Sequence, residues 1–464
     1  MINLTVKDIA QYTNATVKGD ENLVINKVVT DSRKDVKDSL FIALKGEKFD
    51  GHSYAQDVAS KGAKAIVVDH DLNLEITQII VEDTRIALGL IGKLNRQRSK
   101  AKVCSITGTC GKTTVKEMTF EILKTMGKTI ATKGNLNNDI GVPLTLLEIN
   151  SDIEYAVVEM GANHPGEITY SVNLACPIAA TINNVGSAHL EGFGSLHGVY
   201  ETKSEILDYV LNHDGVGFVN SENEFINDWQ KDYKEFYGNH LFSFGLSDTD
   251  KVRAYNIEIN ENGCASFSFE VKKENELLTG KVALALPGKH NVLNALSAIS
   301  LASSLGATAQ NIIDGLENVK PVAGRLSFKK LDNVILIDDA YNASYTSVIA
   351  SIDTLSMLDG KKVFIFADMG ELGEFAQKLH ENVGEHAFGK IDYLLTFGKL
   401  AKFATDKFIS LGCKAQGFTD KEELKKAILP LLNEEKVYVA VKGSHAMNMH
   451  EIVDFICNSK VKEC

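Results

Sequence analysis

The amino-acid sequence predicts an α/β protein with three domains. Apolar runs rich in β-branched residues alternate with helical patterns along the whole chain, which is typical of largely parallel sheets covered by helices. A chain of 464 residues is longer than one hydrophobic core usually serves, so its length favours about three domains. Many apolar runs end in polar residues or glycine, as strands do where a parallel sheet meets its ligand.

The first predicted domain comprises residues 1–100. Its candidate strands are "SLFIALKG", "AKAIVVD" and "TQIIVED", at residues 39–46, 63–69 and 77–83. A helical pattern follows at residues 84–100 and ends in a basic run. We expect a small α/β domain whose boundary lies just after this run.

The second predicted domain comprises residues 101–318. It opens with a strand at 101–107, a glycine-rich loop and a helix at 112–127. Later strands are expected at 155–161, 178–185 and 215–220, and a long helix at 290–306. Because residues 252–286 alternate more strictly, we expect a smaller antiparallel sheet beside a mainly parallel one.

The third predicted domain comprises residues 319–464 and begins near "KPVAGRL". Its candidate strands are "NVILIDDAYN", "KKVFIFADMG", "YLLTFG" and "KVYVAVKGS". Each is an apolar run that ends in polar residues or glycine, which predicts a Rossmann-like sheet with ligands at the carboxyl ends of its strands.

Composition narrows the function further. Hydrophobic residues make up 44% of the chain and charged residues 24%, as in a folded globular protein. The net charge of -12 argues against nucleic-acid binding by bulk charge, but permits a local pocket for an anionic ligand. The start of the chain resembles no signal peptide, no run is apolar enough for a membrane span, and seven scattered cysteines indicate neither disulfides nor zinc. We therefore expect a cytoplasmic protein without a membrane partner.

"SITGTCGKTT", at residues 105–114, predicts a phosphate-binding loop. A Walker A loop would place a glycine where Ile106 stands, so the loop is a shorter variant. Backbone N–H groups of such a turn and the following helix bind anions, Lys112 would reach the terminal phosphates of ATP, and Thr113 would ligate Mg²⁺. The alternative is an ordinary turn between a strand and a helix. The predicted loop consists of Gly108, Thr109, Cys110, Gly111, Lys112, Thr113 and Thr114.

Five further stretches carry polar residues that an α/β core does not require. They contribute Asn135, Asn137 and Asn138 in one loop, Glu159 at a strand end, His189 after another strand, Lys203 on a helix and Asn291 at a helix start. Each alone has an ordinary structural explanation. Read together with the loop, Thr113 and Glu159 would hold one Mg²⁺ on the phosphates, and His189 would help to hold a second.

The motifs "GNLNNDIGVPLTLL", "VVEMGA", "IDDAYNA", "ADMGELGE" and "VKGS" resemble those of the Mur ligase family. Matching stretches run from residue 31 to about 451, and their combination resembles the members that add a dipeptide. The resemblance implies an ATP-dependent ligase that joins D-alanyl-D-alanine to UDP-N-acetylmuramoyl-tripeptide through an acyl phosphate, in cytoplasmic peptidoglycan precursor synthesis. A monomer is expected, although the sequence does not reveal the oligomeric state. No nucleic acid is expected as a partner.

The resemblance also implies roles for individual residues. Lys203 would react with CO₂ to form a carbamate that ligates the second Mg²⁺, Asn291 would meet the adenine, and Arg325 would reach the γ-phosphate. Lys112, His189, Lys203 and Arg325 would be the catalytic set. Asp338 and Asp339 would bind ATP or orient the amine, together with Tyr341 and Asn342. The uridine nucleotide would meet Asp31, Ser32, Arg33, Lys45, Gly46, Asp50, Gly51 and His52.

Three departures from the family pattern leave alternatives open. Cys110 stands where asparagine or serine is usual, and it is interpreted as packing rather than as a nucleophile. Residues 344–347 (Ser-Tyr-Thr-Ser) replace Asn-Pro-Asp-Ser, and His445 replaces an arginine, both near the expected amine pocket. The alternatives are a sibling ligase that adds lysine or diaminopimelate, a folate polyglutamylating enzyme, and an ATP-binding regulatory module.

Overall fold

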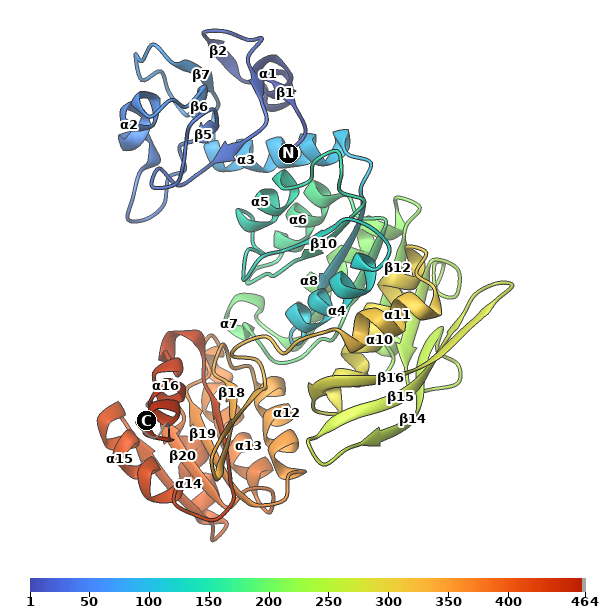
Figure 1. Cartoon of the computed structure of the whole chain (residues 1–464), viewed down its shortest axis with the longest axis vertical. Helices are drawn as coiled ribbons and strands as arrows, with labels where there is room; N and C mark the ends of the chain where they lie inside the picture. The colour runs from blue at the N-terminus through green and yellow to red at the C-terminus, as the bar shows by residue number, and fades with distance from the viewer. Residues whose placement is uncertain (461–464) are drawn as a thin grey trace.

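The computed structural model describes residues 1–460 as three α/β domains arranged one after another (Figure 1). The fold class predicted from the sequence is confirmed. The predicted domain boundaries at residues 100 and 318 lie in the connections between α3 and β8 and between α11 and β17. Within residues 1–460, no helix combines the length and the apolarity that a membrane crossing requires.

The N-terminal domain is built on a five-stranded sheet in the order β2-β7-β6-β5-β4, with only β2 antiparallel. A small antiparallel pair, β1 and β3, accompanies it. The strands are β1 (Leu4–Thr5), β2 (Thr16–Lys18), β3 (Val24–Ile25), β4 (Val28–Val29), β5 (Leu40–Ile42), β6 (Ala65–Val68) and β7 (Thr77–Ile80). The helices are α1 (Val6–Thr13), the 3₁₀ turn η1 (Gly51–Tyr54), α2 (Ala55–Ser60) and α3 (Thr84–Arg98).

The central domain contains one nine-stranded sheet in the order β16-β15-β14-β13-β12-β11-β8-β10-β9. Its strands are β8 (Lys102–Thr107), β9 (Thr129–Ala131), β10 (Tyr155–Glu159), β11 (Ala179–Ile182), β12 (Val216–Asn220), β13 (Leu241–Gly245), β14 (Val252–Ile259), β15 (Cys264–Lys272) and β16 (Leu277–Pro287). Its helices are α4 (Lys112–Lys124), α5 (Gly141–Leu147), α6 (Glu167–Ala175), α7 (Leu190–Phe193), α8 (Leu196–Leu211), α9 (Ile226–Asp232), α10 (His290–Ser304) and α11 (Ala309–Glu317).

The antiparallel pairing predicted for residues 252–286 is present between β14, β15 and β16. These strands do not stand apart, because β14 also pairs in parallel with β13 at two positions and so extends the main sheet.

Strand β8 is buried on both faces, as expected for a strand in the middle of a parallel sheet. Val103 packs with the cluster under α5, α6 and α8, whereas Cys104 and Ile106 pack with the cluster under α4 and α10. Ile106 is therefore a core residue, and the strand ends at Thr107, as predicted.

The C-terminal domain is a six-stranded Rossmann-like sheet in the order β17-β18-β22-β19-β20-β21, with only β17 antiparallel. Its strands are β17 (Ser327–Leu331), β18 (Val334–Asp339), β19 (Lys361–Ala367), β20 (Tyr393–Phe397), β21 (Lys414–Phe418) and β22 (Val437–Lys442). Its helices are α12 (Tyr345–Ser356), α13 (Ala376–Ala387), α14 (Lys402–Ser410), α15 (Lys421–Leu431) and α16 (His450–Lys460), with short 3₁₀ turns η2 (Gly373–Phe375) and η3 (His445–Met447).

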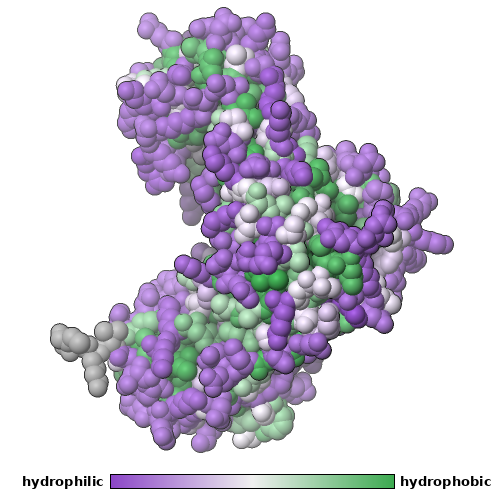
Figure 2. All heavy atoms as spheres, turned by 45° about the vertical axis from the view of Figure 1, so that its right-hand side comes forward, coloured by the Kyte–Doolittle hydropathy of each residue, from purple (hydrophilic) through white to green (hydrophobic). Residues whose placement is uncertain are grey.

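On the face shown in Figure 2, polar side chains cover most of the surface, and the molecule is hollowed on one side between the N-terminal and C-terminal domains. Helix α3 connects the first domain to the second by packing on α5 and α6. The side chain of Asn95 fastens this junction, because its amide donates to the carbonyls of Leu146 and Ile149 at 2.8 and 2.9 Å. Its oxygen accepts from the backbone N–H of Ile2 at 2.9 Å, and the residue is fully buried.

Replacing Asn95 by alanine should lower the free energy of unfolding by about 2–4 kcal/mol, because three backbone groups lose their partner in a buried place. Urea unfolding followed by circular dichroism measures the change. Gln97→Ala is the matched control on the same helix, since within residues 1–460 that side chain accepts only from the Tyr12 hydroxyl at the surface. Equal midpoints for the two variants would contradict the assigned role of Asn95.

Candidate active site

The central and C-terminal domains enclose a cavity of about 780 Å³, a volume typical of sites for small organic ligands. Residues far apart in the sequence meet in its wall. Of the residues predicted to act, the cavity is lined by Thr109, Cys110, Gly111, Lys112, Thr113, Thr114, Asn135, Asn137, Asn138, Glu159, His189, Asn291, Arg325, Asp339, Tyr341 and Asn342.

The phosphate loop joins the end of β8 to the start of α4 at Lys112. Gly108 and Gly111 have φ angles of 149° and 77°, a backbone region that favours glycine. The Lys112 ammonium folds back onto the carbonyls of Gly108 and Thr109 at 2.7 and 3.3 Å, and burial lowers its pKa. Its amine therefore lies over the same turn whose N–H groups would bind phosphate.

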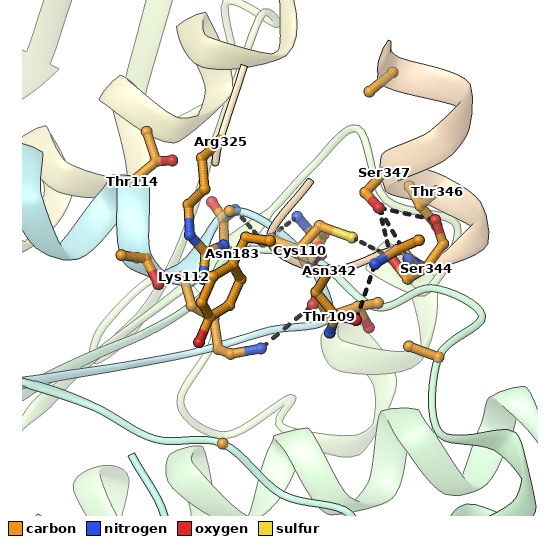
Figure 3. Close-up of a pocket in the computed structure, with 18 of the residues that line it drawn as sticks. Thr109, Cys110, Lys112, Thr114, Asn183, Arg325, Asn342, Ser344, Thr346 and Ser347 are labelled. Atoms are coloured by element: carbon orange, nitrogen blue, oxygen red, sulfur yellow. Dashed lines mark hydrogen bonds between the residues drawn. The ribbon is translucent and has the colours of Figure 1, made fainter. Parts of the chain in front are cut away.

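Side chains that follow β11 hold the loop in place. Asn184 accepts from the backbone N–H of Cys110 at 2.8 Å, and Asn183 donates to the Cys110 carbonyl at 2.9 Å. Across the domain interface, Cys110 Sγ lies 3.0 Å from the hydroxyl of Ser344 at the start of α12 (Figure 3). Neither asparagine was predicted as a site residue, although "TINNV" stands at a strand end as Glu159 does.

Glu159, at the end of β10, is 2% exposed and is held by neutral donors. Thr113 Oγ1 donates to its Oε2 at 2.9 Å, and Asn137 donates to its Oε1 at 2.7 Å. Within residues 1–460 no basic side chain forms an ion pair with this carboxylate. A buried carboxylate without a protein cation, beside a threonine hydroxyl, offers the hard oxygen ligands that Mg²⁺ prefers, so these residues fit the predicted ion.

His189 and Lys203 lie near each other around Phe193. The imidazole of His189 meets the Phe193 ring edge-on with 6.3 Å between ring centroids, and the Lys203 ammonium lies 5.4 Å from the same ring. Lys203 is 2% exposed, and no carboxylate among the described residues pairs with it. Burial and the repulsion of Lys112 lower the pKa of Lys203 to about 7. Lys203 does not line the cavity wall.

The C-terminal domain supplies the opposite wall of the cavity. The Arg325 guanidinium stacks 4.4 Å from the Tyr341 ring centre. Asp339 and Lys442 end the neighbouring strands β18 and β22 and form a buried ion pair at 2.6 Å. Burial raises the pKa of Asp339, and Lys442 opposes that rise. Lys442 was missed, although it stands in the quoted "VKGS" motif.

The neighbouring loops of this wall are tied together. Lys442 donates to the Asn342 carbonyl at 3.1 Å, and the Asn342 side chain accepts from the backbone N–H of His445 at 3.3 Å. His445 meets the Tyr341 ring edge-on. Asp338 does not face the cavity and instead pairs with Lys329 on the adjacent strand.

Asn291 lies at the start of α10 and is bonded within the protein. Its amide donates to the Pro287 carbonyl at 2.7 Å, and its oxygen accepts from Asn294 at 2.8 Å. Asn294 in turn accepts from Asn183, so one chain of amides connects α10 to the phosphate loop. The predicted contact of Asn291 with adenine stays a prediction.

The residues predicted to bind the uridine nucleotide lie in the N-terminal domain, and none of them lines the cavity. Asp31 forms an exposed pair with Arg33 at 2.8 Å, and Lys45 bridges to Asp50 in the backbone. His52 is buried between Asp50 and Asp69. These contacts of Asp31, Arg33, Lys45, Asp50 and His52 are all made within the N-terminal domain. The nucleotide roles of Asp31, Ser32, Arg33, Lys45, Gly46, Asp50, Gly51 and His52 stay predictions.

A phosphate loop that shares one cavity with a buried carboxylate and a Rossmann-like domain is typical of nucleotide-dependent ligases. Three family models match the chain from its N-terminal to its C-terminal part: the Mur ligase family catalytic domain at residues 24–95, the Mur ligase middle domain at 106–302, and the Mur ligase glutamate ligase domain at 324–445. The chain belongs to the Mur ligase family, and the resemblance seen in its motifs is confirmed.

Individual relatives narrow the comparison. The chain is 40% identical to the UDP-N-acetylmuramoyl-tripeptide--D-alanyl-D-alanine ligase of Escherichia coli over 98% of both chains. It resembles a crystal structure of MurF from Acinetobacter baumannii with a TM-score of 0.90 and 33% identity, covering 98% of this chain and 99% of that one. MurF from Thermotoga maritima, solved in complex with ADP, gives a TM-score of 0.81 and 27% identity, covering 94% of this chain and 98% of that one.

Replacing Lys203 by methionine should stabilise the protein most at low pH. The lysine has a pKa of about 7 in the folded protein and near 10.5 when unfolded, so the unfolded chain binds the extra proton between these values. Wild-type stability therefore rises with pH across this window, and the advantage of methionine should shrink from about pH 7 towards pH 10. Thermal unfolding of both proteins in CO₂-free buffers across this pH range measures the difference in stability.

Lys124→Met is the control for this experiment, because Lys124 lies exposed on α4 beside Glu121. It should show no such dependence on pH. A Lys203→Met protein no more stable than wild type below neutral pH would contradict the assigned cost of burying this amine.

Proposed function

We propose that this chain adds D-alanyl-D-alanine to UDP-N-acetylmuramoyl-tripeptide, with ATP hydrolysis driving amide formation in peptidoglycan precursor synthesis. The observation that carries the proposal is the pairing of Thr113 and Glu159 at the phosphate loop, opposite Arg325 across one cavity. Full-length similarity to ligases of this name supports the choice of substrates. The cytoplasmic location and the monomeric state remain predictions from the sequence.

The first step would form an acyl phosphate. The terminal carboxylate of the tripeptide attacks the γ-phosphorus of ATP, and the bond to the leaving ADP oxygen breaks. Lys112, on the loop, and Arg325, from the C-terminal domain, face the same cavity and would balance the charge that develops. Thr113 and Glu159 would hold Mg²⁺, which neutralises phosphate charge when bound.

The second step would transfer the acyl group to the dipeptide. The free amine attacks the activated carbonyl, an amide bond forms, and phosphate leaves with the electrons of the broken C–O bond and takes up the proton that the amine nitrogen loses. The wall formed by Tyr341, Asn342 and His445 is our proposed place for the amine substrate, since the buried Asp339–Lys442 pair holds it rigid. Enclosure between two domains would keep water from the acyl phosphate.

Lys203 would carry a carbamate in the active enzyme. A buried amine with a pKa near 7 is substantially neutral at physiological pH, so its nitrogen can attack the carbon of CO₂ and then release a proton. The product bears an anionic oxygen, which suits a second Mg²⁺ as an ammonium does not. The lack of a carboxylate partner within residues 1–460 supports this conversion.

Phosphate release with ATP and UDP-N-acetylmuramoyl-tripeptide should depend on D-alanyl-D-alanine. The assay compares this dipeptide with lysine, diaminopimelate and glutamate at equal concentrations, and omits each substrate in turn as a control. Turnover with lysine or diaminopimelate but not with the dipeptide would favour a sibling ligase. ATP binding without any amine-dependent turnover would favour the regulatory module instead.

Lys203→Ala should lose at least about 99% of ligase activity and regain part of it with a short carboxylic acid, which can replace the missing anionic ligand. Lys124→Ala, on the exposed side of α4, is the control and should need no acid. Incorporation of ¹³C-bicarbonate gives a carbamate signal in the wild-type protein that Lys203→Ala should lack. Absence of both rescue and signal would contradict the carbamate.

A further inference from the structure

The motif "ADMGELGE", residues 367–374, follows strand β19, and the proposed function leaves it without a role. In the structure the 3₁₀ turn η2 (Gly373–Phe375), at the end of the motif, lies against α7 of the central domain. The backbone N–H of Glu191 donates to the carbonyl of Glu371 at 3.2 Å, and Gly373 lies close to the Cα of Glu191. This loop is therefore a point of contact between the two domains that form the cavity.

Two non-glycine residues with left-handed backbones meet at this contact. His189 has a φ angle of 52° and Glu371 one of 60°. Such a conformation costs about 1–2 kcal/mol for a residue with a Cβ and persists where the surroundings require it. Here each backbone turn aims its side chain at the other, and Nδ1 of His189 is hydrogen-bonded to the Glu371 carboxylate.

The base of the loop is fixed within the C-terminal domain. The carboxylate of Asp368 accepts from the backbone N–H groups of Leu400 and Ala401 at 3.0 and 2.6 Å. The N–H of Met369 donates to the buried His380 ring at 3.0 Å. These hydrogen bonds hold the loop that carries Glu371 in a fixed position on the C-terminal domain.

The contact between His189 and Glu371 contributes little to the stability of the fold, and its main effect is to orient the imidazole ring of His189. The side chains of His189 and Glu371 are 32% and 59% exposed, and ion pairs at such exposure contribute at most about 1 kcal/mol. Because a carboxylate can only accept, Nδ1–H must donate, and Nε2 is the nitrogen left for a ligand. Histidines that bind metals commonly donate their other N–H to a carboxylate in this manner.

We propose that Glu371 is a positioning residue, which the C-terminal domain supplies to orient His189 for its ligand in the active site. The inference rests on the proposed function for the identity of that ligand, the second Mg²⁺. It follows that the ligand sphere of His189 is complete only when the C-terminal domain is docked on α7. Docking of the amine-binding domain and assembly of the metal site are then one event.

Two substitutions at Glu371 distinguish a positioning role from a role as a direct metal ligand. Glu371→Gly removes the carboxylate and suits the left-handed backbone, whereas Glu371→Gln keeps an oxygen that accepts from Nδ1–H. Glu374→Gly and Glu374→Gln are matched controls three residues further on, because Glu374 is exposed and has no ionic or hydrogen-bonding side-chain partner within residues 1–460.

Hydrogen exchange of residues 189–193, in full-length protein without metal or nucleotide, measures positioning independently of activity. Exchange should rise about threefold or more in Glu371→Gly and stay near wild type in Glu371→Gln and both Glu374 variants. In the ligase assay, the Mg²⁺ concentration for half-maximal rate should rise about tenfold in Glu371→Gly, with the KM for UDP-N-acetylmuramoyl-tripeptide unchanged, and less than about threefold in Glu371→Gln.

Exchange and Mg²⁺ dependence in Glu371→Gly that equal those of Glu374→Gly would overturn the proposal. A Glu371→Gln enzyme as impaired as Glu371→Gly would also overturn it, because the carboxylate would then act as a direct ligand. Wild-type protein without dipeptide-dependent turnover would refute the proposed function instead, and the exchange result would still decide whether Glu371 positions His189.

Discussion

The buried carboxylate of Glu159 is the constraint on which the rest of the site depends. Burying a carboxylate at 2% exposure without a protein cation costs free energy, unless hydrogen-bond donors surround the group and a bound cation neutralises its charge. Thr113 and Asn137 provide the donors, and they tie the phosphate loop and the asparagine loop to the end of β10. One charge thus sets the relative positions of three segments that are far apart in the sequence.

A second buried charge organises the opposite wall. Asp339 and Lys442 sit side by side because β18 and β22 are parallel neighbours in register, and the lysine also bonds the carbonyl of Asn342. In the central domain the buried charge has no counterion within the described chain, whereas here it is neutralised internally. The central domain therefore leaves the charge of Glu159 without an internal partner, whereas the ion pair of the C-terminal domain fixes the shape of the opposite wall.

The fold and the phosphate loop were predictable because their signals are local. Apolar runs mark β8 and its neighbours, and the glycines before Lys112 mark a turn that only a few residues can adopt. Lys442 and Glu371 were missed, since their importance comes from strand register and from a contact between domains. Neither leaves a periodic pattern in the sequence. The joining of β14 to the parallel strands was missed for the same reason, because pairing between strands is non-local.

Cys110 is one of the departures from the family pattern, and the structure shows which residue it contacts. Its interpretation as packing fits its surroundings, but what it packs against is Ser344, which is itself a departure from the family pattern. Two small polar groups therefore meet where the phosphate loop touches the start of α12, and Thr346 lies against Gly186 beside them. Since a Cβ on Gly186 would come within 2.6 Å of the Thr346 hydroxyl, the interface has no room for larger side chains there. The departures at residues 110 and 344 thus form a single contact, and a change at either one acts on both domains.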